Sequence, residues 1–145
     1  MKWQTHLAGG FLAGMLAGAT PAGIAVAGIT ALLPDIDTWE SKVGRASPLL
    51  SIPIRIIFGH RGVFHSLLAA GLLFLVAKAL FPGYALYIFL GYLSHLILDA
   101  LTPQGVKFLW PIPHSFRIPL VPTGSILEGA FFLLLVILIG RGFLY

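Results

Sequence analysis

Histidines and acidic residues of this chain gather near the ends of its apolar segments. His95 and Asp99 are four residues apart, so on a helix they lie one turn apart on the same face. An imidazole and a carboxylate placed in this way can share a metal ion or form a hydrogen-bonded pair. Pro103 predicts the end of that helix, because proline cannot continue it. Ionisable groups within so apolar a segment are costly and usually mark a functional site.

Other histidines and aspartates extend this pair into a set of candidate metal ligands: His6, Asp35, Asp37, His60, His65, His95 and Asp99. The chain has no cysteine, and imidazole and carboxylate ligands without thiolates suit zinc, manganese or iron(II). The set exceeds one tetrahedral site and allows two or more divalent ions, with zinc as the first expectation. Paired ions suit phosphate ester hydrolysis, because they activate water and stabilise the attacking and leaving oxygens.

Catalytic and substrate-binding roles follow from the chemistry of the same region. Asp35 or Asp37 is expected to act as ligand or base. Arg45 and Arg61 could clamp a phosphate, since a guanidinium group binds it bidentately, so Arg61 is also a catalytic candidate.

Each of these residues also has a structural interpretation. Glu128 is a weaker candidate ligand, because Ser125 and Glu128 have the spacing of a capping box, which favours a helix cap. Asp35 and Asp37 could be turn residues, and the His95–Asp99 pair could be a structural hydrogen bond between helices.

Composition predicts an all-α, polytopic membrane protein with about five helices, built as two helical hairpins plus a C-terminal helix. The chain has 145 residues, of which 58% are hydrophobic and 10% charged, unlike a soluble domain. Residues 1–145 are expected to form a single membrane-embedded, hydrolase-like domain. Later helices are expected over 65–81, 84–101 and 125–140, while Leu49–Phe58 is too short to span and is expected to be surface-lying or re-entrant.

The first apolar segment, Leu7–Leu33, allows one long helix or a hairpin. One helix would be roughly 40 Å long, more than a bilayer core of about 30 Å. The hairpin, with its turn at Thr20-Pro21, is favoured because only antiparallel packing brings His6 close to Asp35.

The charge distribution predicts orientation and partners. The formal net charge is +4, and in the expected topology most lysines and arginines fall on one side. The positive-inside rule then places the N-terminus and the metal site on the cytoplasmic side of a multi-pass inner-membrane protein. Anionic lipid headgroups are expected as partners of this charge, and no nucleic acid is expected.

Four motifs together resemble the YdjM-like family, which comprises LexA-regulated inner-membrane proteins of bacteria and archaea classed as metal-dependent hydrolases. The motifs, in chain order, are Thr5-His6, Leu33-Pro34-Asp35-Ile36-Asp37, Gly59-His60-Arg61-Gly62-Val63-Phe64-His65-Ser66 and Ser94-His95 with Asp99-Ala100-Leu101-Thr102-Pro103-Gln104-Gly105. The resemblance covers nearly the whole chain. It implies a membrane-bound hydrolase and does not name a substrate.

The order of the candidate ligands is also similar, more distantly, to that of zinc-dependent phospholipase C and the fungal single-strand nucleases. Those enzymes add a His-xxx-Glu pair late in the chain, whereas here Gly124 lies four residues before Glu128. They also use an N-terminal amine as a ligand, and here Met1 precedes His6 by five residues.

These observations predict a membrane-bound, phosphoesterase-like hydrolase that acts on a phosphoester of a lipid or lipid-linked substrate. The alternative is a non-catalytic metal-binding membrane protein or a transporter. A transporter should have its polar groups near the bilayer midplane, whereas here they cluster at one end of the expected helices.

Overall fold

The structure is a computed structural model, which describes residues 1–37 and 62–143. This part of the chain forms α-helices α1 (Trp3–Leu16), α2 (Pro21–Thr30), α5 (Leu67–Leu80), α6 (Ala85–Ala100) and α7 (Ile126–Gly142), with short 3-10 helices η1 (Leu33–Asp37) and η2 (Val63–His65). Arg45, His60, Arg61 and the segment Leu49–Phe58 lie outside the described residues.

Helices α1 and α2 form a hairpin. Gly18 has a positive φ of 67° in the turn, a conformation that glycine adopts without steric cost. Thr20 then caps α2 by accepting a hydrogen bond from the Gly23 amide at 3.3 Å, and Pro21 occupies the first helical turn, where its missing N–H costs nothing. The turn over residues 17–20 therefore separates α1 from α2, and Thr20-Pro21 starts α2, close to where the sequence predicts the turn.

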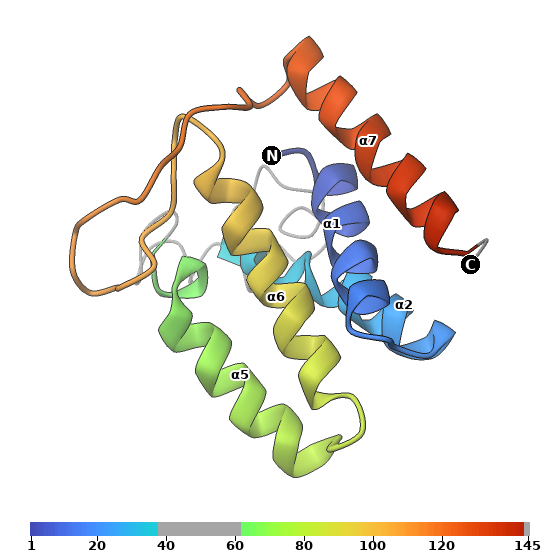
Figure 1. Cartoon of the computed structure of the whole chain (residues 1–145). Helices are drawn as coiled ribbons and strands as arrows, with labels where there is room; N and C mark the ends of the chain where they lie inside the picture. The colour runs from blue at the N-terminus through green and yellow to red at the C-terminus, as the bar shows by residue number, and fades with distance from the viewer. Residues whose placement is uncertain (38–61, 144–145) are drawn as a thin grey trace.

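Helix α6 lies at the centre of the fold. It contacts α1 and α2 on one side and α5 on the other, and α7 packs against α1 (Figure 1). Helix α5 begins at a Ser66 cap, whose hydroxyl accepts from the Ala69 amide at 3.3 Å. The Leu67 amide also donates to the Phe108 carbonyl at 2.9 Å, so the segment after α6 fixes the start of α5 beside His65.

The prediction of a polytopic membrane protein is wrong for the described residues. Among residues 1–37 and 62–143, no helix is both long and apolar enough to cross a membrane. Helix α7 has 17 residues and would be about 26 Å long, short of a hydrocarbon core of about 30 Å. The other helices are shorter still: the turn at Gly18 divides the apolar run Leu7–Leu33 between α1 and α2, and α5 and α6 have 14 and 16 residues.

Close approach between α2 and α6 depends on Gly91. A Cβ atom at this position would overlap the Ala27 carbonyl oxygen and the Thr30 hydroxyl. Thr30 is itself held by hydrogen bonds to the Val26 and Ala27 carbonyls, so neither neighbour can move without disturbing α2. The two helices therefore pack almost backbone to backbone just before His95.

We expect Gly91→Ala to lower the free energy of unfolding by about 3 kcal/mol, because the methyl group forces α2 and α6 apart. Gly71→Ala on α5 is the matched control, since a Cβ there meets nothing within 4 Å. It should raise stability by about 0.5–1 kcal/mol through helix propensity. Urea unfolding of both variants measures the difference, and equal effects would contradict the close approach.

Candidate metal centre

Five donor side chains from four separate elements converge in the interior. His6 comes from α1, Asp35 from η1, His65 from η2, and His95 and Asp99 from α6. His6, His65, His95 and Asp99 are fully buried, and the Asp35 side chain is 15% exposed. Two sets of three have donor atoms within 4.8 Å of one another, namely His6, Asp35 and His95, and His65, His95 and Asp99.

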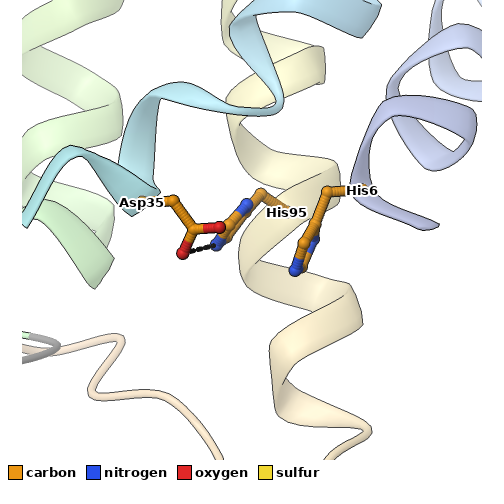
Figure 2. A group of neighbouring side chains, drawn as sticks. All are labelled: His6, Asp35 and His95. Carbon is orange, nitrogen blue, oxygen red and sulfur yellow. Dashed lines mark ion pairs between the residues drawn. The ribbon is translucent and has the colours of Figure 1, made fainter. Parts of the chain in front are cut away.

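Four donor atoms lie between η1, η2 and α6, with the two histidine nitrogens between the two carboxylates. The Nε2 atoms of His65 and His95 are 3.3 Å apart. Oδ2 of Asp99 lies 3.7 Å from His65 Nε2 and 3.6 Å from His95 Nε2. Oδ1 of Asp35 lies 3.8 Å from the same two nitrogens (the His95 pair is dashed in Figure 2). Two ligands of a tetrahedral zinc ion are roughly 3.3 Å apart, so these spacings fit a metal site that needs little contraction.

Asp99 presents its two oxygens to different partners. Oδ2 faces His65 and His95, whereas Oδ1 lies 3.4 Å from His6 Nε2 and accepts a hydrogen bond from the α-amino group of Met1 at 2.7 Å. Asp99 belongs to one donor set and its Oδ1 also faces His6 of the other, whereas His95 belongs to both sets.

His6 lies against His95 with its ring nearly parallel. The ring centroids are 3.7 Å apart and the interplanar angle is 16° (Figure 2). Neither ring nitrogen of His6 makes a hydrogen bond to any described residue, although both are buried. Buried polar atoms without hydrogen bonds are rare and costly. An imidazole nitrogen that lies near carboxylates can instead donate its lone pair to a metal ion.

The ring orientation of His95 is set by the backbone of α2. Its Nδ1 lies 2.7 Å from the Ala31 carbonyl oxygen, which can only accept, so Nδ1 carries the proton. This leaves the Nε2 lone pair directed at the donor cluster. Metal-ligating histidines commonly use such a backbone contact to fix their tautomer.

Burial sets the charge of these groups. It lowers the pKa of His95 to about 4, helped by the neighbouring His6 and opposed by Asp99 and Asp35. Burial also lowers the pKa of His6. For Asp99, burial acts to raise the pKa, but polar contacts with His6 and His95 outweigh it and hold the pKa well below its usual value. At neutral pH His6 and His95 are thus neutral and Asp99 is ionised, the protonation states that metal binding requires.

Glu128 lies outside both donor sets, in a network of its own. Its Oε1 accepts from the Lys2 amide at 2.5 Å and the Thr5 hydroxyl at 3.2 Å, and its Oε2 accepts from the Gly124 amide at 2.5 Å. Burial acts to raise the pKa of Glu128, but these backbone hydrogen bonds lower it overall. The carboxylate thereby joins the N-terminal ends of α1 and α7, both of which favour negative charge.

The other sequence-predicted residues are placed only in part. Asp37 is the last residue of η1, and its side chain is not described. Sequence reasoning missed Thr5, whose burial beside His6 follows from its hydrogen bond to Glu128, and the Ala31 carbonyl that orients His95. For Thr5, the only available signal was its position next to His6. No sequence signal marks the Ala31 carbonyl.

The fold and the cluster together define a class: in the described residues, a helical protein with a buried imidazole–carboxylate cluster whose donor atoms could hold a metal ion. The whole chain matches one family model, described as YdjM inner membrane protein, over residues 1–144. The protein belongs to this family.

Two relatives illustrate the range of similarity. The chain is 38% identical to the Bacillus subtilis protein YvsG over 136 residues, which cover 88% of this chain and 85% of YvsG. It is 48% identical over 109 residues to the inner membrane protein YdjM of Escherichia coli, covering 69% of this chain but only 56% of that protein. The chain thus spans about half the length of the E. coli relative. No solved structure matches it.

Proposed function

We propose that this protein is a metal-dependent hydrolase of the inner membrane that cleaves a phosphoester of a lipid or lipid-linked substrate. The observation that carries the proposal is the buried cluster of His6, Asp35, His65, His95 and Asp99, in which the two nitrogens of His6 make no hydrogen bond to any described residue. Such a donor set suits zinc, manganese or iron(II).

The chain's own residues would have separate roles in binding the ions and in activating water. His65, His95 and Asp99 would hold one ion, and His6 with the second oxygen of Asp99 would hold another. Asp35, the least buried of the five donors, would orient a water molecule at the edge of the cluster and accept its proton. Bound ions would supply an activated water and neutralise charge on the phosphoryl oxygens.

The phosphate clamp by Arg45 and Arg61 remains a prediction from the sequence, because both residues lie outside the described part. His60 and Asp37 likewise remain candidate ligands predicted from the sequence alone. A guanidinium group close to the cluster would compensate the charge of a phosphate that the two carboxylates repel.

The membrane part of the proposal is supported by the family and by charge. The family model and the E. coli relative are both named for the inner membrane. A formal net charge of +4 favours the anionic lipid surface of the cytoplasmic leaflet, and we place the metal centre on that side.

Metal analysis combined with a hydrolysis assay tests the function. Protein purified, stripped with a chelator and reloaded with Zn²⁺ or Mn²⁺ should bind the ion stoichiometrically and release phosphate from phosphatidic acid in detergent micelles. Stripping should remove the activity and reloading should restore it. Protein that binds neither ion would overturn the proposal, and bound metal without turnover of lipid or water-soluble phosphoesters would favour the non-catalytic alternative.

A further inference from the structure

An apolar groove is lined in part by residues of η1, η2 and α6, the elements that also carry Asp35, His65 and His95. Its volume is about 180 Å³, and its lining residues are Leu33, Ile36, Phe64, Ala69, Leu73 and Tyr92. None of them is charged. The groove borders the hydrophobic cluster around Leu96, against which Leu33, Ala69 and Leu73 also pack.

The groove and the donor cluster are built from the same short elements. Leu33 and Ile36 flank the Pro34-Asp35 pair in η1, and Phe64 directly precedes His65 in η2. Tyr92 lies one turn before His95 on α6. The apolar lining of the groove would therefore adjoin a group bound at the donor atoms of Asp35, His65 and His95.

Hydrogen bonds between side-chain hydroxyls and backbone groups hold the walls of the groove in place. The Tyr92 hydroxyl donates a hydrogen bond to the Phe64 carbonyl oxygen, which ties α6 to η2. The Ser66 hydroxyl donates to the Val63 carbonyl at 2.5 Å and accepts from the Ala69 amide at 3.3 Å, which ties η2 to α5. A largely preformed apolar recess next to a few polar groups is the usual form of a small-molecule site.

We propose that this groove is a substrate subsite for the alkyl chain that adjoins the phosphate, so that the enzyme selects phosphoesters whose phosphate carries an aliphatic chain. This inference rests on the proposed function, because it assumes that a phosphate binds at the metal centre. Each buried methylene contributes roughly fourfold to affinity. The first methylenes of the chain therefore give strong preference over a short-chain phosphate.

Ala69→Phe tests the assignment by filling the groove. Ala69 is half-buried and lines the recess, and its side chain takes no part in the donor cluster. Ala79→Phe is the matched control, since Ala79 is exposed on the same helix. Both variants add the same bulk to α5, but only one adds it inside the groove.

Calorimetric binding of dodecyl phosphonate and methyl phosphonate to the metal-loaded protein gives the readout without turnover. Wild-type protein and Ala79→Phe should bind dodecyl phosphonate at least about tenfold more tightly than methyl phosphonate. Ala69→Phe should lose that advantage while keeping its affinity for methyl phosphonate and its metal content.

The outcomes separate the two proposals. Equal affinity of wild-type protein for both phosphonates, or an unchanged preference in Ala69→Phe, would overturn the chain subsite and leave the metal centre intact. Metal-loaded protein that binds neither phosphonate would overturn both the subsite and the phosphoesterase function.

Discussion

Replacing Asp99 by asparagine is expected to abolish metal binding and phosphoester hydrolysis together. Asp99 is the donor whose two oxygens face three histidines, with Oδ2 facing His65 and His95 and Oδ1 facing His6. An amide keeps the shape of the side chain but removes the negative charge that balances two cations. We expect metal affinity to fall by more than about 100-fold, beyond the loss typical of an outer-shell partner, with hydrolysis at background.

Glu128→Gln is the matched control for this variant. It makes the same isosteric change at another buried carboxylate, one that lies outside both donor sets and accepts hydrogen bonds from the Lys2 and Gly124 amides, just before α1 and α7. We expect it to lower stability and to keep the metal. Mass-spectrometric metal analysis and titration with a chromophoric chelator compare the two variants, with circular dichroism to establish that each is folded. Asp99→Asn protein that retains its metal would rule out Asp99 as a ligand.

The sequence indicated which residues would meet, because two local signals were strong. Thr20-Pro21 predicted the turn between α1 and α2, and this hairpin is what brings His6 near Asp35. The four-residue spacing of His95 and Asp99 predicted their shared helical face. Given antiparallel helices, the grouping of donors at one end follows from the order of the chain alone.

Other features could not be read from the sequence, for identifiable reasons. The membrane-spanning architecture was inferred from the number of apolar residues, which does not fix where a helix begins and ends. In the structure, the apolar run Leu7–Leu33 is divided by a turn between α1, which ends at Leu16, and α2, which covers Pro21–Thr30. The hydrogen bond from His95 to the Ala31 carbonyl and the network of Glu128 join elements far apart in the chain. Local patterns contain no information about such pairs.

Metal-free protein is expected to lose stability as the pH falls from about 6.5 towards 4. Burial lowers the pKa of His95 from its usual 6.5 to about 4, so between these values the unfolded chain binds a proton that the folded chain does not. Stability therefore rises with pH across this window and is constant above it with respect to this group. The difference corresponds to about 3 kcal/mol for His95, and His6, whose pKa burial also lowers, adds to it in the same direction.

Asp99 does not oppose this trend within the window, because its pKa lies well below the usual value and it stays ionised while the histidines titrate. Urea unfolding in the presence of a chelator, at several pH values between 4 and 8, measures the slope. His95→Gln should make the profile shallower, since the contribution of His95 is gone and that of His6 remains. His114→Gln should leave the profile unchanged, because His114 is exposed on the segment after α6. A profile equally steep in His95→Gln would mean that His95 is not held neutral in the folded protein, and the donor role assigned to its Nε2 would lose its electrostatic basis.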